Sequence, residues 1–455
     1  MLGWLKSTKL HFIGIGGIGM SGIAEVLLDL GYQVSGSDLA TSPVTENLQR
    51  KGARIFKGHD RENVEGVDLV VYSSAIDPEN PECQRASELH IPMIRRAEML
   101  AELMRLKYGM AVAGSHGKTT TTSLVATIFQ EAGLDATHII GGIVSNLGGN
   151  ARKGEGKFLI AEADESDGSF LQLSPIVAAV TNIDDDHLDH YGTRERIQAA
   201  FVEFVNKLPF YGRAAMNAND PVSVSLRDRL KRPVVWYGIE TAAEYEARNL
   251  RFSAAGTSFD LYSEGKSVGE ISTHLIGTHN VSNTLAAIAL SHGAGLEWSS
   301  IRTGLLGFKG VGRRLEKIYE KESFLMIDDY GHHPTEVSAT IRALRSVDTR
   351  KLTVVFEPHR FSRTQNFWEE FQQCFAGVDE LFVLPIYPAG EASIEGICSE
   401  KLVAAMISKG FAVRFLSGPD EMKSVFLERA QMPGIFLTLG AGPVSRRARE
   451  LVKSL

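Results

Sequence analysis

A short glycine loop in the middle of the chain carries the residue types that hold a triphosphate. It lies between an apolar run at 110–113 and a helical pattern at 123–130, and it consists of Gly114, Ser115, His116, Gly117, Lys118, Thr119 and Thr120. In such a strand, loop and helix, backbone NH groups surround the phosphates, the lysine reaches the β and γ oxygens, and the threonine hydroxyl ligates Mg²⁺. The spacing is two residues shorter than the usual phosphate loop, but the order of the elements favours ATP binding over a chance match.

Carboxylates and histidines follow two further apolar runs. An acidic segment, Glu162–Asp167, comes after 158–161, and a cluster of aspartates and histidines, Asp184–His190, comes after 177–182. Carboxylates at the end of a strand beside a phosphate loop are expected as Mg²⁺ ligands, and the second cluster could hold another hard cation. The alternatives are a solvated acidic turn, which we prefer for Asp167, and a helix N-cap made by one of the aspartates.

A second glycine turn lies near the N-terminus, where Gly14, Gly16, Gly17 and Gly19 close a strand and open a helix. Asp38 ends the next strand. This is the dinucleotide fingerprint with its acidic ribose partner, in which glycines let the backbone approach a diphosphate. It predicts a bound nucleotide diphosphate, with a merely structural turn as the alternative, and it does not decide which nucleotide.

The C-terminal third carries two polar segments after predicted parallel strands. Asp329, Tyr330 and His332 belong to the first, and Arg360 and Arg363 to the second. Arginines three residues apart can clamp one carboxylate or phosphate bidentately. A lone histidine is more often structural, but two adjacent histidines beside two aspartates favour a site.

Apolar runs that alternate with helical patterns must position these residues. The alternation recurs three times and predicts an α/β fold of three domains, each built on a mainly parallel sheet. We expect a Rossmann-like domain at 1–108, a phosphate-loop ATPase domain at 109–314 and a second Rossmann-like domain at 315–455. Short alternating strands at 245–273, with Gly265 at a turn, predict a small antiparallel subsheet on the middle domain.

The composition fits an ordinary folded protein. The chain has 455 residues, 44% of them apolar and 23% charged, with three cysteines and a net charge of −7. This excludes wholesale disorder, a disulfide framework and general attraction to nucleic acid or anionic lipid. We find no signal peptide or run of membrane-spanning length, so a cytoplasmic protein is expected.

Taken in order, the motifs resemble the Mur ligase family over essentially the whole chain. The matching segments are GIGGIGMSGIAE from Gly14, RRAEMLAELM from Arg95, GSHGKTTTT from Gly114, EADESD from Glu162, NIDDDHLDHY from Asn182, GTHNVSN from Gly277, DDYGHHPTEV from Asp328 and EPHRFSRT from Glu357. The resemblance implies a front domain that holds a uridine diphosphate sugar, a central ATPase and a C-terminal amino acid domain. The first glycine turn would therefore serve UDP and not NAD.

The resemblance also implies roles for single residues. Lys118 and Thr119 would bind ATP phosphate and Mg²⁺, and Glu162 and His187 match further metal ligands. The residues matching nucleotide contacts are His279, Asn280, Asn283 and the cation Arg313, and those around the amino acid and the reacting carboxylate are Asp329, Tyr330, His332, Arg360 and Arg363.

Within the family, the motifs are similar to those of the branch that joins L-alanine to UDP-N-acetylmuramate in peptidoglycan synthesis. The implied reaction uses ATP to make an acyl phosphate, which the alanine amine then attacks. Lys118, His187, Arg313 and His332 are the expected catalytic residues. His332 is a candidate to accept the amine proton, or it orients the alanine carboxylate instead.

Two departures and three alternatives accompany this interpretation. Phe201 stands where sibling ligases carry a carbamylated lysine, and Pro443 replaces an expected polar residue in the turn at 440–443. The alternatives are a murein tripeptide recycling ligase of the same family, a nicotinamide-dependent oxidoreductase fused to an ATPase, and a nucleotide-binding regulator without catalysis.

Overall fold

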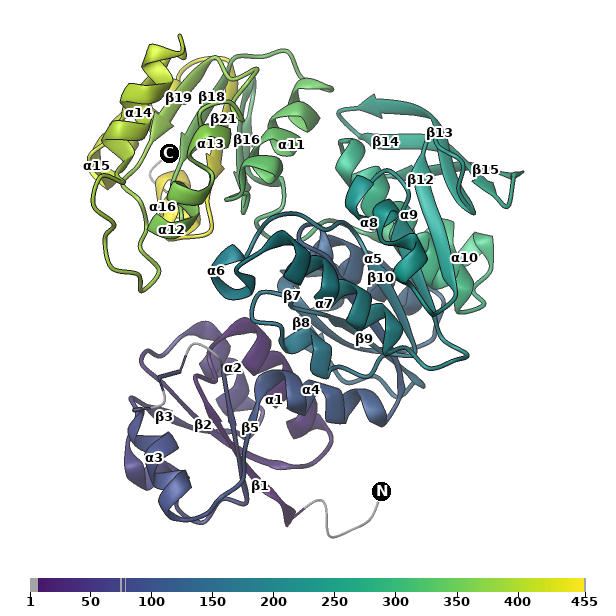
Figure 1. Ribbon diagram of the computed structural model, residues 1–455. Coiled ribbons are helices and arrows are strands. Elements are labelled where there is room, and N and C mark those ends of the chain that lie inside the picture. Colours follow the sequence, from purple (N-terminus) through teal and green to yellow (C-terminus); the bar gives the residue numbers. More distant parts are fainter. Residues whose placement is uncertain (1–6, 74–75, 78, 454–455) are drawn as a thin grey trace. The chain divides into compact units, whose positions relative to one another are not determined.

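The chain forms two compact units, shown as a ribbon in Figure 1 from a computed structural model that describes residues 7–73, 76–77 and 79–453. The first unit runs to Asn249 and adds Asp260–Ile271 and Ser282–Lys309. The second consists of Leu250–Phe259, Ser272–Val281 and Gly310–Leu455. The expected boundary near residue 314 lies close to the start of the last of these segments, whereas that near residue 108 lies inside the first unit.

The N-terminal sheet has five strands in the order β3-β2-β1-β4-β5, all parallel to their neighbours. The strands are β1 (Lys9–Ile13), β2 (Gln33–Asp38), β3 (Arg54–Lys57), β4 (Leu69–Tyr72) and β5 (Met93–Arg95). The helical elements are α1 (Ile18–Asp29), α2 (Pro43–Arg50), the 3₁₀ turn η2 (Arg61–Val64), α3 (Pro81–Glu88) and α4 (Arg96–Arg105). This strand order is that of a Rossmann sheet, in which ligands bind beyond the carboxyl ends of the strands, so the expected fold is confirmed.

The central sheet of ten strands has the order β15-β14-β13-β12-β11-β10-β6-β9-β7-β8. Its first strands are β6 (Tyr108–Ala113), β7 (Thr137–Val144), β8 (Gly149–Arg152), β9 (Phe158–Glu162), β10 (Val177–Val180), β11 (Arg213–Asn217) and β12 (Val234–Ile239). The helices are α5 (Lys118–Glu131), α6 (Leu188–Tyr191), α7 (Arg194–Asn206), α8 (Pro221–Ser225), α9 (Thr278–Gly293) and α10 (Trp298–Gly307). Helix α5 begins at Lys118, five residues before the predicted start, so the lysine is the first residue of the helix and not part of the loop.

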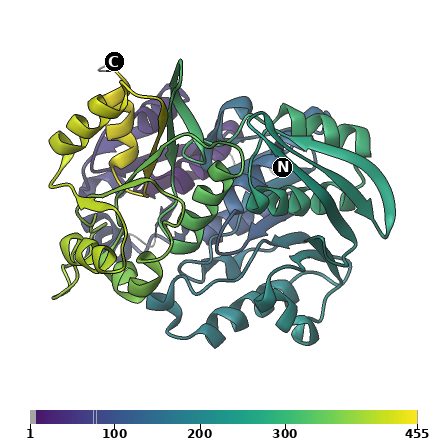
Figure 2. The ribbon, with the colours of Figure 1, turned by 90° about the horizontal axis from the view of Figure 1, so that it is seen from above.

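Three strands at 245–273 extend one edge of this sheet. They are β13 (Tyr245–Ser253), β14 (Gly256–Ser263) and β15 (Lys266–Thr273), drawn in teal and green in Figure 2. Two-residue connections join them, which only antiparallel strands allow. Gly265 lies in the second connection with a φ of 76°. The predicted subsheet is therefore present, as a continuation of the central sheet through β12.

The C-terminal sheet has six strands in the order β16-β17-β21-β18-β19-β20. The strands are β16 (Glu316–Lys321), β17 (Phe324–Asp329), β18 (Leu352–Phe356), β19 (Glu380–Val383), β20 (Val413–Phe415) and β21 (Gly434–Leu439). The helices are α11 (Pro334–Arg345), α12 (Phe361–Asn366), α13 (Trp368–Phe371), α14 (Ser399–Ser408), α15 (Pro419–Arg429) and α16 (Val444–Val452). Within the described residues, the edge strand β16 pairs antiparallel with β17 and the other strand pairs of this sheet are parallel, which confirms a mainly parallel sheet.

Helices cover both faces of the C-terminal sheet. Successive residues of β17 alternate between two buried clusters, because side chains of a strand point to opposite faces. Leu325 and Ile327 pack with α11 and α14, whereas Phe324 and Met326 pack with α15 and α16. This burial fixes the register of the strand and so places the polar residues that follow it at the carboxyl edge of the sheet.

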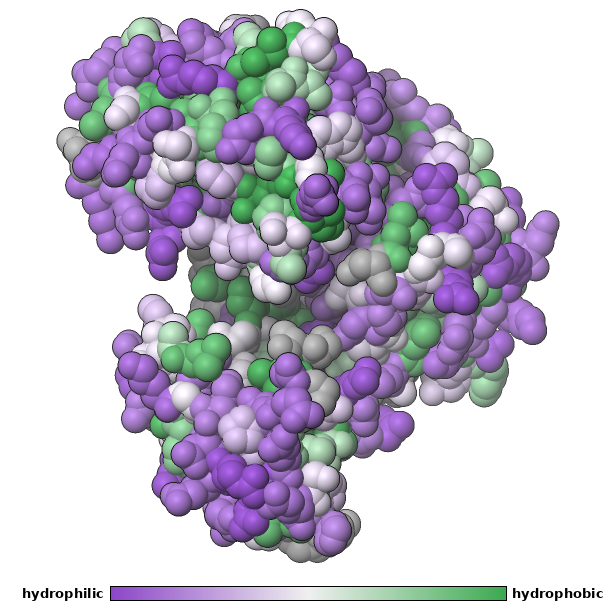
Figure 3. Space-filling view, turned by 60° about the vertical axis from the view of Figure 1, so that its left-hand side comes forward, coloured by the Kyte–Doolittle hydropathy of each residue, from purple (hydrophilic) through white to green (hydrophobic). Residues whose placement is uncertain are grey.

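The surface is largely polar. Hydrophilic residues cover most of the face drawn in Figure 3, as the charge content of the chain leads one to expect. Among the described residues, no helix has both the length and the apolar character needed to cross a membrane.

Candidate active site

The phosphate loop of the first unit joins β6 to α5 and depends on two glycines. Gly114 has a φ of 128° and Gly117 a φ of 82°, a region that side chains rarely adopt. A Cβ at Gly114 would lie 2.0 Å from Thr181 Oγ1, and one at Gly117 would lie 2.2 Å from Asn283 Oδ1. Larger residues therefore cannot replace these glycines without moving the loop. Asn283, expected as a nucleotide contact, lies beside Gly117.

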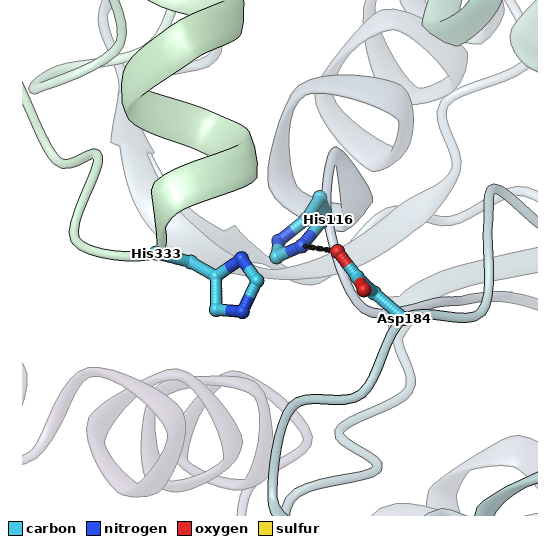
Figure 4. A group of neighbouring side chains, drawn as sticks. All are labelled: His116, Asp184 and His333. Carbon is cyan, nitrogen blue, oxygen red and sulfur yellow. Dashed lines mark hydrogen bonds and ion pairs between the residues drawn. The ribbon is translucent and has the colours of Figure 1, made fainter. Parts of the chain in front are cut away.

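Hydrogen bonds fasten the loop to the segment that follows β10. His116 NH donates to Asn182 Oδ1 at 3.0 Å, and Thr181 Oγ1 donates to the His116 carbonyl at 2.6 Å. The His116 ring lies with Nε2 3.0 Å from Asp184 Oδ2, the dashed contact in Figure 4. Ser115 Oγ accepts from the Asp184 NH at 2.8 Å. Ser115 and His116 thus hold the loop in shape.

Lys118 is an ion-pair partner of a buried carboxylate. Its Nζ donates to the Gly114 carbonyl at 2.7 Å, to the Ser115 carbonyl at 3.2 Å and to Glu165 at 2.8 Å. Burial lowers the pKa of the ammonium, but the charges of Glu165 and Glu162 outweigh this effect and raise the pKa above its usual value. The Lys118 side chain is therefore a cation that folds back onto the phosphate loop and is held there by its carbonyls and by Glu165. Glu165, which we did not select from the acidic segment, is its main partner.

Oxygen atoms suited to a hard cation gather at the end of β9. Thr119 Oγ1 donates to Glu162 Oε1 at 3.2 Å, and Glu162 Oε2 accepts from the Gly141 NH at 2.9 Å. Burial raises the pKa of the Glu162 carboxyl, which is the environment of a carboxylate that lacks a full set of compensating charges. A hydroxyl and a carboxylate beside a phosphate loop match the ligand types that Mg²⁺ prefers.

His187 lies next to two carboxylates, one of which is Glu165, the partner of Lys118. Its Nε2 lies 3.5 Å from Glu165 Oε1 and 3.5 Å from Asp186 Oδ2. Burial lowers the pKa of the ring, but Glu165 and Asp186 raise it above its usual value. The backbone at His187 has a φ of 61°, a costly conformation that often marks functional sites.

Two further predicted nucleotide contacts, His279 and Asn280, lie in the second unit. Asn280 Nδ2 donates to the Ile276 carbonyl at 2.9 Å. Burial, with Arg314 and Arg342, lowers the pKa of His279 to about 4, so the ring is neutral. His279 lines a cavity of about 360 Å³ together with Gly277, Thr278 and one face of α11.

The N-terminal glycine turn bonds to the end of β2. The NH groups of Gly14 and Ile15 donate to the Ser37 carbonyl at 2.9 and 3.0 Å. The Gly16 NH donates to Asp38 Oδ2 at 2.9 Å. Asp38, predicted to bind a ribose, thus also caps the turn itself. Gly17 is the N-cap residue of α1 and Gly19 lies in its first turn.

Arg96 links this turn to the acidic segment, a connection that the motifs did not reveal. A Cβ at Gly19 would lie 2.8 Å from Arg96 Nη1. Arg96 Nη2 donates to Asp164 Oδ2 at 3.0 Å. Arg96 was visible only as part of the RRAEMLAELM segment, and no spacing rule pairs an arginine with an aspartate 68 residues away.

Arg313 in the second unit binds the C-terminal turn. Its Nη2 donates to the Gly440 carbonyl at 2.7 Å, and its guanidinium lies 4.5 Å from the centre of the Tyr330 ring. Burial lowers the pKa of Arg313, and a stacked arginine with a φ of 60° is held in one conformation. The carbonyls of the turn at 440–443 therefore hold this arginine, and Pro443 offers no polar side chain there.

Asp329 is a buried carboxylate at the end of β17. Its Oδ2 accepts from the Leu315 NH at 2.7 Å, and Oδ1 accepts from the Gly331 NH at 2.8 Å and from Thr340 Oγ1 at 3.2 Å. Burial nevertheless raises the pKa of Asp329 from 3.8 to about 6. The residue thus fixes the turn that carries Tyr330 and His332.

The raised pKa of Asp329 predicts a pH-dependent effect on stability. The folded chain binds the Asp329 proton more tightly than the unfolded chain, so the contribution of this group to the free energy of unfolding is greatest below about pH 4 and falls as the pH rises through about 6. We expect the melting temperature of Asp329→Asn, relative to the wild type, to increase between pH 5 and pH 8. A difference that does not change over this range would contradict the shift.

Arg360 is the N-cap residue of α12, and Arg363 lies in the first turn of this helix. Arg360 has a φ of 72°, and its NH donates to the Tyr387 carbonyl at 2.8 Å. Arg363 Nη1 lies 3.4 Å from His359 Nδ1, and burial, together with both arginines, lowers the pKa of His359 to about 4. Arg360 also lies 3.9 Å from Glu391. His359 belongs to the EPHRFSRT segment but was not selected as a site residue, and Glu391 belongs to no pattern that distinguishes it from ordinary loop residues.

Three models of known protein domains match successive parts of the chain. The model of the Mur ligase family catalytic domain matches residues 9–108, the Mur ligase middle domain matches 112–291, and the Mur ligase glutamate ligase domain matches 313–442. Together these cover most of the sequence. The chain belongs to the Mur ligase family. The resemblance seen in the eight motifs is thereby confirmed.

Close relatives extend over nearly the full length. The UDP-N-acetylmuramate–L-alanine ligase of Geotalea daltonii is 49% identical over 99% of this chain and 98% of its own, and that of a Geobacter species, strain M21, is 51% identical over 96% of both. A crystal structure of the UDP-N-acetylmuramate–alanine ligase from Thermotoga maritima superposes with a TM-score of 0.84, at 29% identity and 98% coverage of both chains. A murein peptide ligase from Psychrobacter arcticus shares the fold, with a TM-score of 0.75 at 24% identity.

Phe201, which stands where sibling ligases are expected to carry a carbamylated lysine, is a core residue in this chain. The residue is 1% exposed and packs edge to face against Phe170 at 5.3 Å within the core of the first unit. A core aromatic ring offers no oxygen or nitrogen to a metal ion. The position is therefore a packing position in this chain.

Proposed function

We propose that the protein is an ATP-dependent ligase that joins L-alanine to the lactyl carboxylate of UDP-N-acetylmuramate through an acyl phosphate, in peptidoglycan precursor synthesis. The observation that carries the proposal is the phosphate loop of the first unit, in which Lys118 lies between the loop carbonyls and Glu165, beside Thr119 and Glu162. ATP and a UDP sugar are intracellular metabolites, so we propose a cytoplasmic location. We retain 1–108, 109–314 and 315–455 as the proposed sugar nucleotide, ATP and amino acid domains.

The relatives support alanine as the amino acid. Those about 50% identical to this chain carry the name of the alanine ligase. The murein peptide ligase, the nearer alternative from the sequence, shares the fold at 24% identity. The nicotinamide alternative has no support, because the domain with the first glycine turn matches a Mur ligase model.

Carboxylate activation is the first chemical task. One lactyl carboxylate oxygen attacks the γ-phosphorus of ATP, the bond to the β-γ bridging oxygen breaks, and ADP leaves. Two unit charges 4 Å apart repel by about 4 kcal/mol at an effective dielectric constant of 20. We assign Lys118 and Arg313 to offset this repulsion. The backbone NH groups of the loop at Gly114 and Gly117, and of Thr120 in the first turn of α5, would hold the phosphates.

Thr119, Glu162 and His187 are the proposed residues that hold Mg²⁺. The hydroxyl and the carboxylate fit this ion, and His187 contacts Glu165, the partner of Lys118. When bound, the ion would neutralise phosphate charge during transfer. The protein's own part is to hold the Glu162 carboxylate and the Thr119 hydroxyl together at the end of β9.

Amide formation is the second task. The uncharged alanine amine attacks the acyl carbon, and the carbon–oxygen bond to phosphate breaks, so the released phosphate keeps the former carboxylate oxygen. Arg360 and Arg363 are the proposed partners of the alanine carboxylate. Tyr330, His332 and Asp329 lie at the end of β17, which is separated from β18 by β21 but ends at the same edge of the sheet, and Asp329 holds the turn there.

His332 is expected to bind and not to remove the amine proton. Its Nδ1 lies 3.1 Å from the Tyr330 carbonyl and 3.3 Å from Glu336 Oε2, contacts that fix the ring. We expect His332→Gln to raise the KM for L-alanine about tenfold, the scale of one lost hydrogen bond to a charged group, and to leave the pH profile of kcat unchanged. A flattened profile would identify His332 as the base.

Phosphate release tests the function. With ATP, Mg²⁺ and UDP-N-acetylmuramate present, each amino acid is added in turn and inorganic phosphate is measured. We expect release to depend on both the sugar nucleotide and L-alanine. Release with a tripeptide but not with alanine would favour the recycling ligase, and no release with any acceptor would refute the ligase assignment.

A further inference from the structure

The fully buried carboxylate of Glu82 contacts side chains from four other segments of the N-terminal sheet region. Glu82 lies in the first turn of α3 and is 0% exposed. Its Oε2 accepts from Ser37 Oγ at 2.6 Å and lies 3.0 Å from His59 Nδ1. Its Oε1 accepts from Asn63 Nδ2 at 2.7 Å and lies 3.5 Å from His11 Nε2. These five residues, the Glu82 network, join α3 to β1, to β2, to the loop after β3 and to η2.

The partners of Glu82 favour the charged form of its carboxylate. Burial raises the pKa of Glu82, but hydrogen bonds from His11, Ser37 and Asn63 outweigh it and lower the pKa to about 2. A buried charge of this kind is tolerated only with such partners. Satisfied polar networks favour a single arrangement of the elements that contribute to them. The family's reaction, as described above, uses none of these five residues.

Ser37 connects the network to the glycine turn. Its hydroxyl donates to Glu82, while its carbonyl accepts from the NH groups of Gly14 and Ile15. The next residue, Asp38, accepts from the Gly16 NH through its carboxylate. The Ser37 carbonyl and the Asp38 carboxylate therefore take up three of the turn's NH groups, and their position decides where the remaining part of the turn points.

His59 supports the same backbone from the other side. The Gly58 NH, directly before His59, donates to the Asp38 carbonyl at 2.7 Å. His59 Nδ1 also lies 3.0 Å from Ser37 Oγ, so this nitrogen is within hydrogen-bond distance of both the Ser37 hydroxyl and the Glu82 carboxylate. The Glu82 carboxylate thus connects the loop after β3 and the turn η2 to the end of β2.

We propose that Glu82 is a positioning residue for the sugar nucleotide, which fixes the Ser37–Asp38 backbone and through it the glycine turn that receives the UDP diphosphate. This inference rests on the proposed function, since it takes the turn as the UDP site. Glu82 acts through Ser37 and contacts no substrate. Its effect belongs to sugar nucleotide affinity, and not to ATP binding or the chemical step.

The test replaces the carboxylate by an amide of the same shape. In Glu82→Gln, an NH₂ group faces hydrogen-bond donors, so Ser37 and the turn must shift. We expect the KM for UDP-N-acetylmuramate, and its Kd by calorimetry on the full chain, to rise about tenfold, the scale of a lost hydrogen bond to a charged group. The kcat and the KM values for ATP and L-alanine should stay within about twofold.

A second variant and a matched control make the test specific. Ser37→Ala removes the link while leaving the carboxylate, and should raise the same KM. The double variant should be no worse than the single ones, because both break one pathway. Glu88→Gln, on the exposed side of α3, removes a carboxylate that pairs with Arg61 and Arg85 and should leave every constant unchanged.

The outcomes separate this inference from the function itself. Wild-type protein that neither binds UDP-N-acetylmuramate nor uses it would overturn the proposed function. Normal wild-type activity with an unchanged sugar KM in Ser37→Ala, or with equal losses for all three substrates, would overturn the role of Glu82 as a positioning residue. If Glu82→Gln fails to fold, Ser37→Ala alone decides.

Discussion

Lys118→Ala is expected to lower kcat by at least about 10³-fold while the protein still binds UDP-N-acetylmuramate. The lysine is the cation of the phosphate loop, and one preorganised charge on a transferring phosphoryl group accounts for losses of this size. The proposed sugar nucleotide site lies on another sheet of the first unit, around the turn that bonds to Ser37 and Asp38. Steady-state phosphate release and calorimetry with the sugar nucleotide measure the two effects.

Stability needs a control in this experiment. Loss of Lys118 leaves Glu165, which is 2% exposed, without its main partner, and a broken buried ion pair can cost 3–5 kcal/mol. Lys207→Ala removes an exposed lysine from the same unit and should leave kcat and sugar binding unchanged. Retained activity in Lys118→Ala would refute the ATP site, whereas loss of sugar binding would show that the variant is misfolded or that the two sites are coupled.

Glu162→Gln is expected to lower kcat about 100-fold at millimolar Mg²⁺, with partial recovery at higher concentrations. The amide oxygen can still accept from the Gly141 NH and the amide NH₂ group can donate to Thr119 Oγ1, but the negative charge that a hard cation prefers is lost. Because the carboxylate also faces Lys118, the variant should change the Mg²⁺ requirement more than the KM for L-alanine. Initial rates over a Mg²⁺ series provide the measurement.

Asp167→Asn is the matched control within the same acidic segment. Asp167 Oδ1 accepts from the Ser169 NH at 3.0 Å, a local turn contact that an amide oxygen also makes. Its rate and Mg²⁺ dependence should match those of the wild type. If Glu162→Gln showed an unchanged Mg²⁺ requirement, or if both variants behaved alike, Glu162 would not be a metal ligand.

Local patterns predicted the sheets and the loops well because the signals are short-ranged. Apolar runs such as 352–356 coincide with buried strands, and the glycines of the phosphate loop occupy backbone conformations that other residues avoid. The edge strand β16 was not predicted. Its residues are mostly charged or exposed, so burial left no periodic signal there.

Side-chain partnerships were harder to predict than elements. Lys118 pairs with Glu165, one of the four carboxylates in the acidic segment Glu162–Asp167. Only the three-dimensional path of β9 and of the turn after it determines which carboxylate reaches the lysine. Glu82 meets His11, 71 residues earlier, through the packing of α3 on the sheet. Such contacts depend on tertiary structure, and no spacing within the sequence encodes them.

Transfer of a carboxylate oxygen to phosphate tests the central claim most directly. UDP-N-acetylmuramate labelled with ¹⁸O in the lactyl carboxylate is converted with ATP and L-alanine, and the phosphate is analysed by mass spectrometry. An acyl phosphate route places one ¹⁸O atom in the phosphate for every amide bond formed. Phosphate without ¹⁸O, released alongside amide product, would contradict phosphorylation of the acid and with it the proposed mechanism.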